Sequence, residues 1–153
     1  MTKGRLSPRD YLLFLLSRRE YSEKELRSRL KTRACTAVEI DEALCLIKGL
    51  DLQSDARYAA AKARAEGRRK GDRSVRQALR TKGIAADQIA LELDALAPEA
   101  ERVVEAVRRF ENKPLDVKLK GKVWRFLSAR GFSSDSIKNG IAHLQAMQRT
   151  EEA

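Results

Sequence analysis

One apolar pattern occurs three times along this chain of 153 residues, first at an interval of 49 residues and then at one of 48. In each copy a leucine has an apolar neighbour four residues before it, and others five, ten, fourteen and seventeen residues after it. The leucines are Leu30, Leu79 and Leu127, and their neighbours are, in the same order, Leu26, Val75 and Val123; Cys35, Ile84 and Phe132; Ile40, Ile89 and Ile137; Leu44, Leu93 and Ile141; and Ile47, Leu96 and Leu144. Such spacings predict two amphipathic helices in each copy. Repeats of this length are typical of helical units that stack on one another, so the pattern predicts an all-α fold.

A third, more variable helix is predicted ahead of each pair, over residues 8–19, 54–66 and 98–111. Capping-box spacing, a hydroxyl residue followed three positions later by glutamate, marks the starts of the next two helices of the first copy: Ser22 with Glu25, and Thr36 with Glu39. We therefore expect an elongated array of three tandem three-helix repeats, the second of them basic, with a disordered tail at the end. The expected boundaries are 1–52, 53–97, 98–147 and, for the tail, 148–153.

The turn between the two patterned helices has a sequence signature of its own. A basic residue stands three positions after each leucine, at Arg33, Lys82 and Arg130. The residue after it is glycine in the second and third copies and Ala34 in the first. Glycine just past a helix end adopts the left-handed conformation without strain, and a cation there faces the negative end of the helix dipole. This structural role explains the basic residue better than ligand contact does, and Ala34 predicts that the first turn closes differently or less stably.

The charge of the chain points to an anionic partner. The formal net charge is +10 and the pI is about 9.9, which favours nucleic acid first and an anionic membrane surface second. No apolar run approaches the ~18 residues of a membrane span, and we find no secretion signal, so a cytoplasmic protein is expected. The phosphate-binding, nucleophile-elbow and zinc motifs of enzymes are absent, so we expect no catalytic residues, no metal and no cofactor. Cys35 is expected in the core, and His143 at the surface or partly packed.

A basic stripe recurs on the middle helix of two repeats. With Val75 and Leu79 facing inward, the cations on the opposite face are Arg73, Arg76 and Arg80, and a shift of 49 residues gives Lys24, Arg27 and Lys31. The equivalent positions in the third repeat are Gly121, Trp124 and Ser128, so the stripe is lost there. The second repeat adds further cations: Arg64, Arg68, Arg69, Lys70 and Lys82.

Two interpretations of these cations remain open. They could be a solvated helix face plus a flexible basic loop, EGRRKGDR, or they could contact phosphates, in which case affinity should fall steeply with salt. The recurrence in register favours phosphate contact, without base-specific readout. Trp124, the sole tryptophan, is expected to be buried in the third repeat, with a protein-contact role as the alternative.

Four stretches resemble the RecX family of bacterial regulatory proteins: FLLSRREYSEKELRSRL, SDARYAAAKARAEGRRKG, SVRQALRTKGI and RFLSARGFSSDSI. The matched family motifs are Arg18 to Ser22, Asp55 to Ala59, Lys82 to Ile84 and Arg130 to Phe132. The resemblance covers about residues 10–145. Departures at Ala34, at GLDLQSDA and at ENKPLDVKLKG put the relative tilt of the repeats in question.

The resemblance implies a curved array that lies in the groove of a filament of RecA on single-stranded DNA. Such a protein damps recombination and repair by opposing filament extension, ATP hydrolysis and strand exchange, and it is neither an enzyme nor bound to a cofactor. We expect a monomer whose partners are RecA and single-stranded DNA, with double-stranded DNA left open and no membrane. The basic stripes would face the filament, and the third repeat would contact RecA through Trp124, Arg125 and Arg130.

Two rival functions fit the same composition. A general nucleic-acid-binding helical module would bind naked DNA or RNA and be indifferent to RecA. A protein-only scaffold would bind its partner with an affinity that hardly depends on salt.

Overall fold

The computed structural model describes residues 4–153, and within them all regular structure is helical, which confirms the predicted fold class. The α-helices are α1 Pro8–Leu16, α2 Glu23–Thr32, α3 Ala37–Gly49, α4 Asp55–Gly67, α5 Asp72–Thr81, α6 Ala86–Ala95, α7 Glu99–Val107, α8 Val117–Ala129 and α9 Ser134–Glu151. A short 3₁₀ helix, η1 Arg108–Phe110, extends α7. The first predicted repeat also includes residues 1–3, which lie outside the described part.

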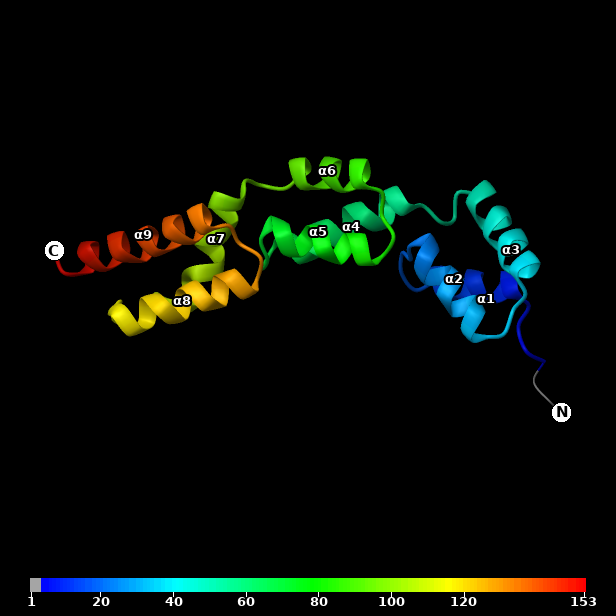
Figure 1. Ribbon diagram of the computed structural model, residues 1–153, viewed down its shortest axis with the longest axis horizontal. Helices are drawn as coiled ribbons and strands as arrows, with labels where there is room; N and C mark the ends of the chain where they lie inside the picture. Colours follow the sequence, from blue (N-terminus) through cyan, green and yellow to red (C-terminus); the bar gives the residue numbers. More distant parts are fainter. Residues whose placement is uncertain (1–3) are drawn as a thin grey trace.

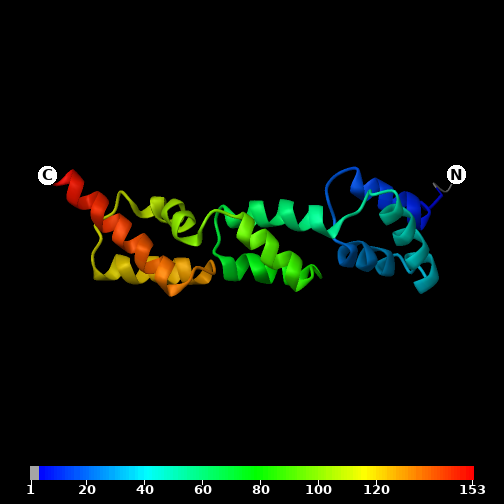
Figure 2. The ribbon, with the colours of Figure 1, turned by 90° about the horizontal axis from the view of Figure 1, so that it is seen from above.

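The helices form three groups of three in an elongated, gently bent row (Figure 1). The view turned by 90° shows α1 and α9 at opposite ends of this row (Figure 2). Each group has a hydrophobic core of its own, built by α1–α3, by α4–α6 and by α7–α9. The molecule is therefore an array of small cores in series.

The repeated apolar positions form these cores. The leucine of the pattern and the apolar residue four positions before it are 0% exposed in all three repeats: Leu26, Leu30, Val75, Leu79, Val123 and Leu127. Cys35 is partly buried against the first core, as expected. Both predicted capping boxes form, with the hydroxyls of Ser22 and Thr36 accepting from the backbone N–H groups of Glu25 and Glu39.

The two ends of the chain differ from the predicted boundaries. The first helix was expected to reach residue 19 but ends at Leu16, where the Ser17 hydroxyl donates to the Phe14 carbonyl at 2.7 Å and competes with the helical bonding pattern. The tail predicted to be disordered from residue 148 is helical to Glu151. Its helix is held because the Gln148 side chain accepts from the Leu115 N–H at 3.2 Å and donates to the Lys113 carbonyl at 2.6 Å.

The same kind of hydrogen bond, from a backbone N–H to a carboxylate, joins the repeats at each junction. The first helical residue of the next repeat caps the middle helix of the repeat before it: Asp55 accepts from the Glu23 N–H at 2.9 Å, and Glu99 accepts from the Asp72 N–H at 2.9 Å. Glu99 also accepts from the Ser133 N–H at 2.6 Å, so one carboxylate serves the starts of two helices. A negative group at a helix N-terminus satisfies free donors and faces the positive end of the dipole. The repeats are thus joined by specific bonds as well as by the chain.

The turn glycines lie at these junctions. Gly83 and Gly131 have φ of 78° and 84°, as predicted, and a Cβ at either position would press on the repeat before it. For Gly131 that Cβ would lie 2.5 Å from the backbone nitrogen of Ser74. Ala34 also adopts the left-handed conformation, with φ of 59°, so the prediction that its turn closes differently is wrong. Within residues 4–153 no repeat precedes the first one, so a methyl group at Ala34 meets no such neighbour.

The pKa values of two junction carboxylates are lowered. Burial opposes ionisation of Glu99, but hydrogen bonds from the Ser133 and Asp72 N–H groups outweigh it and hold the pKa below its ordinary value of 4.5. Burial also opposes ionisation of Glu25, and its hydrogen bond with Lys82 together with the charge of Arg19 lowers that pKa in the same way. Both carboxylates are therefore ionised wherever the junctions are intact at neutral pH.

We predict that the junctions weaken in acid. Because a lowered carboxylate pKa stabilises the folded chain above the unfolded pKa of 4.5, this contribution is lost as pH falls through the folded pKa. The free energy of unfolding, measured by urea titration between about pH 6 and pH 3, should fall. Glu99→Gln should be less stable than the parent at the upper pH, and the difference should shrink toward the lower one. A difference that stays constant over this range would contradict the assignment.

Candidate nucleic-acid interface

The first cation of the predicted stripe, on α2 and again on α5, forms a hydrogen bond across a junction between repeats. Lys24 donates from Nζ to the Thr81 carbonyl at 3.1 Å, and Arg73 donates from Nη2 to the Ser128 carbonyl at 2.6 Å. Each of these carbonyls belongs to the end of the middle helix in the following repeat. The recurrence of a cation at this position therefore has a structural cause that the sequence pattern did not reveal.

Three further predicted cations are paired with carboxylates. Arg27 lies 2.8 Å from Asp41 and 3.4 Å from Glu23, and the hydrogen bond with Asp41 raises its pKa further above the ordinary value. Lys70 lies 2.6 Å from Glu66, and Lys82 lies 2.8 Å from Glu25 across the first junction. An ion pair offers a phosphate less net charge than a free cation does. These residues are weaker candidates than the sequence indicated.

The remaining predicted cations have no ion-pair partner among residues 4–153, and all of them are exposed. They are Lys31, Arg64, Arg68, Arg69, Arg76 and Arg80. Arg76 and Arg80 keep the predicted outward face of α5, whereas Arg68 and Arg69 follow the end of α4. The second repeat therefore carries most of the uncompensated charge of the predicted stripe.

The loop that carries Arg68 and Arg69 is fixed to the third repeat through its backbone. The Gly71 N–H donates to the Arg130 carbonyl at 2.9 Å, and Arg102 donates to the carbonyls of Gly67 and Lys70 at 3.2 and 2.6 Å. These bonds argue against the flexible-loop interpretation. They hold the two arginines at the second junction.

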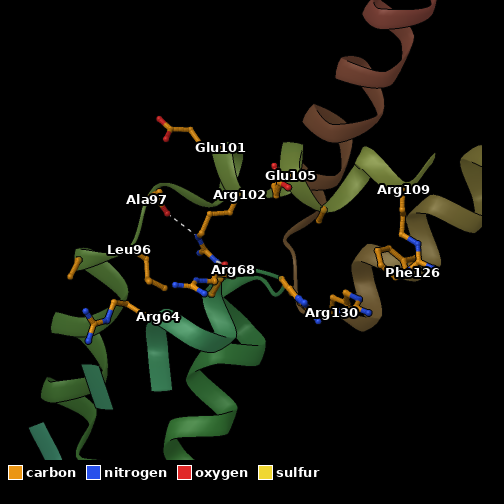
Figure 3. Close-up of a pocket in the computed structure, with 14 residues that line it drawn as sticks. Arg64, Arg68, Leu96, Ala97, Glu101, Arg102, Glu105, Arg109, Phe126 and Arg130 are labelled. Carbon is orange, nitrogen blue, oxygen red and sulfur yellow. Dashed lines mark hydrogen bonds between the residues drawn. The ribbon is translucent and has the colours of Figure 1, made fainter. Parts of the chain in front are cut away.

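A groove of about 920 Å³ lies at this junction, between the second and third repeats (Figure 3). Among the cationic residues its lining contains only arginines: Arg64, Arg68, Arg69, Arg102, Arg109 and Arg130. Arg102 is bonded to Asp72, and the other five have no ion-pair partner among the described residues. We call these five residues the groove arginines. They come from the end of α4, from η1 and from the end of α8, so the groove combines cations from both repeats.

The aromatic ring of Phe126 orders one wall of the groove. The guanidinium carbons of Arg109 and Arg130 each lie 4.6 Å from the centre of this ring, which is within the range of cation–π attraction. Phe110 packs edge-on against the same ring, with centroids 5.4 Å apart and an interplanar angle of 78°. Two of the groove arginines are therefore held in place before any ligand arrives.

Arg102 fixes the geometry beneath the groove. It is only 9% exposed, and besides the two carbonyls of the loop it donates to the Ala97 carbonyl at 2.8 Å (Figure 3). It also donates to Asp72 Oδ1. A buried guanidinium needs such partners, because an unpaired buried charge is costly. Its donors are committed to the protein, so Arg102 positions the junction while the groove arginines face the open space.

The sequence predicted only part of this site. Arg64, Arg68 and Arg69 were predicted as cations of the second repeat, but the sequence did not place them at a junction. Neither Arg109 nor Phe126 was predicted as a site residue. Both lie far from the second repeat in the sequence, so only the packing of the third repeat brings them to the groove.

Comparison with known proteins gives the family. The first three-helix domain of RecX matches residues 9–45, and the second three-helix domain of RecX matches residues 54–92. The regulatory protein RecX of Chromohalobacter salexigens is 35% identical over 147 residues, which cover 94% of this chain and 96% of that protein. The chain belongs to the RecX family. The family predicted from the four motifs is thereby confirmed.

Other RecX proteins agree over nearly the whole length. The regulatory protein RecX of Leptothrix cholodnii is 38% identical over 138 residues, covering 89% of this chain and 88% of that one. The crystal structure of RecX from Lactobacillus salivarius superposes with a TM-score of 0.72 at 25% identity, covering 91% of this chain and 95% of that one. A second crystal structure of regulatory protein RecX has a TM-score of 0.74 at 29% identity and covers 86% of this chain and 69% of that one. This chain thus shares the architecture of a family of regulatory proteins.

Trp124 is not buried as expected. Its side chain is at the surface with 36% exposure, on the outer face of α8. Gly121 and Val117, which is 86% exposed, lie on the same face one and two turns earlier, respectively. We call Val117, Gly121 and Trp124 the α8 apolar strip. Gly121 and Trp124 stand, in the third repeat, at two of the positions that cations occupy in the other two.

The rest of the described chain offers little for other chemistry. Residues 4–153 contain no group of three or more histidine, cysteine or carboxylate side chains placed to hold a metal ion. No helix in that range is long and apolar enough to cross a membrane. His143 is partly buried on α9.

Proposed function

We propose that this protein regulates RecA by binding along the RecA filament on single-stranded DNA and by opposing its extension, ATP hydrolysis and strand exchange. Membership of the RecX family of regulatory proteins supports a regulatory role. The observation that carries the choice of an anionic filament is the convergence of uncompensated arginines on one junction of an elongated basic array. Affinity supplied by such cations is electrostatic and needs no base-specific contact.

The proposed division of labour follows the surface chemistry of the repeats. Arg76 and Arg80 on α5, together with the groove arginines, would face phosphates of the filament. The α8 apolar strip would contact RecA itself, since an exposed tryptophan beside apolar neighbours is typical of protein contact sites. An array that touches more than one RecA subunit would restrain their relative motion. Restraint of that motion would slow ATP turnover.

We predict that the two surfaces can be separated by mutation. The double variant Arg76→Ala/Arg80→Ala should weaken binding to bare single-stranded DNA several-fold, and should reduce the slope of log K against log salt by about 1.4, since each lost phosphate contact removes ~0.7. Trp124→Ala should leave that affinity and slope unchanged but weaken binding to RecA-coated DNA. Fluorescence anisotropy with a labelled oligonucleotide, with and without RecA, measures both.

A matched control is available on the first repeat. Arg9 is exposed and lies 3.4 Å from Asp10, so Arg9→Ala removes a cation that is already paired. It should change neither binding reaction by more than about twofold. Equal losses of bare-DNA binding in the α5 variant and in Trp124→Ala would contradict the division of labour.

A second candidate function is a nucleic-acid-binding module that acts without RecA. The groove favours this second function because all its cations belong to this chain, and no partner is needed to place them. Such a module would bind bare and RecA-coated DNA with the same dependence on Arg76 and Arg80. It would also be indifferent to truncation of Trp124.

A further inference from the structure

We propose that the groove between the second and third repeats is the binding site for a single strand of DNA, whose phosphates are held by the groove arginines. The proposal deepens the function proposed above by naming the site for the strand, and it rests on that function for the choice of DNA as the polyanion.

The charge of the groove has no compensation within the described chain. Arg64, Arg68, Arg69, Arg109 and Arg130 converge on one groove, and none of them has a carboxylate within ion-pair distance. Of the two glutamates in the lining, Glu105 lies 3.2 Å from Arg108 instead. The carboxylate of Glu101 points away from the arginines (Figure 3). Clustered like charges repel one another, so an anion that binds here removes an unfavourable interaction as well as making new ones.

The side-chain type favours phosphate. Every cation in the lining is an arginine, although lysines are abundant elsewhere in the chain. The planar guanidinium can donate two parallel hydrogen bonds to a phosphate group, which the lysine ammonium cannot do with the same geometry. Arg109 and Arg130 are already stacked on Phe126, so less side-chain entropy is lost when they bind.

The size and position of the groove favour a chain of phosphates over a single ion. At about 920 Å³ it is near the upper end of the range for small-ligand sites. Its arginines stand in two sets, one from the second repeat and one from the third. A ligand that satisfies both sets must extend across the junction. A sugar–phosphate backbone can extend in this way. Its binding would then also restrict the relative tilt of the two repeats.

The lining also favours an unpaired strand. Between the arginines lie Leu96 and Ala106, which offer apolar surface to the face of a base. The guanidinium planes of Arg109 and Arg130, which cover the Phe126 ring, are of a type that commonly stacks on bases in single strands. In a duplex these faces are stacked on one another, so a duplex could use the arginines but not the apolar part of the groove. A single strand can use both.

The test measures binding of the full chain to labelled oligothymidylate by fluorescence anisotropy, without RecA. The groove variant is Arg68→Ala/Arg109→Ala, which removes one arginine from each wall. The matched control is Arg9→Ala/Lys48→Ala, which removes the same charge at exposed cations outside the groove that are paired with Asp10 and Glu23. We expect the groove variant to lose about tenfold in affinity at low salt and to reduce the salt slope by about 1.4, whereas the control changes affinity by less than about threefold. Arg68→Lys/Arg109→Lys should keep the slope and still lose affinity, because the charge is kept and the planar fork is lost.

Three outcomes would overturn the proposal. The first is equal loss in the groove variant and in the control. The second is that a duplex of the same length binds as tightly as the single strand and loses as much in the groove variant. The third is that polyglutamate of equal charge competes as well as unlabelled oligothymidylate, which would make the groove a site for acidic protein. This binding test contains no RecA, so its result does not depend on whether the protein inhibits RecA. The groove can therefore be shown to bind a single strand even if the proposed RecA inhibition is contradicted, and the reverse also holds.

Discussion

Replacing Arg102 by alanine is expected to destabilise the third repeat by about 2–4 kcal/mol, which is a large share of the stability of a small helical unit. The Arg102 guanidinium donates to the carbonyls of Ala97, Gly67 and Lys70 and to Asp72, and it is almost fully buried. Its removal leaves carbonyl groups without donors and a cavity at the junction. Asp72 is partly exposed and can be solvated, so its lost ion pair should add little.

The sole tryptophan makes this result measurable. Trp124 lies on α8, so its fluorescence reports the third repeat, whereas far-UV circular dichroism reports all the helices. In urea, the Arg102→Ala transition followed by fluorescence should move to lower denaturant and separate from the transition followed by dichroism, because coupling between adjacent repeats is lost. Arg108→Ala on the same segment removes an exposed arginine and should stay within about 0.5 kcal/mol of the parent. A stable, cooperative Arg102→Ala variant would show that the junction does not depend on this guanidinium.

Replacing Gly131 by alanine is expected to cost about 3 kcal/mol through two effects. The residue has φ of 84°, where a side chain is strained, and its Cβ would lie 2.5 Å from the backbone nitrogen of Ser74. Because the contact is with backbone, the neighbour cannot move aside by changing a rotamer. The second junction would have to open, and the transition reported by Trp124 should again move to lower urea concentration.

Two control substitutions are expected to have much smaller effects on stability. Gly49→Ala at the end of α3 meets no atom within 4 Å and should be neutral or slightly stabilising. Ala34→Gly relieves a φ of 59° and should change stability by no more than about 1 kcal/mol. If Gly131→Ala changed the stability as little as Gly49→Ala, this would contradict the close approach of the third repeat to Ser74.

The repeat pattern was sufficient to predict the interior of each unit. Leu30, Leu79 and Leu127 are all fully buried, and Gly83 and Gly131 have the left-handed conformation that the turn signature required. These features are local, since they depend on helix periodicity and on one turn. The confirmed family and fold class rest on the same local patterns.

What the sequence could not give is the packing of one repeat on the next. The stripe was treated as one surface, yet Lys24 and Arg73 are drawn to carbonyls of the following repeat. Arg109 joins Arg68 at one groove only because the third repeat docks as it does. Trp124 is a different case: it was expected inside, although its position in the stripe pattern of α8 already placed it on the outer face. The docking of one repeat on the next leaves no periodic signal in one sequence.

The most direct test of the central claim is the rate of ATP hydrolysis by the cognate RecA on single-stranded DNA as this protein is added well below one molecule per RecA subunit. If the protein restrains the filament, hydrolysis should fall progressively at these ratios, and the Trp124→Ala variant should require more protein for the same inhibition. If hydrolysis is unchanged while the protein still binds bare DNA in a salt-dependent way, the account of a RecA regulator is contradicted.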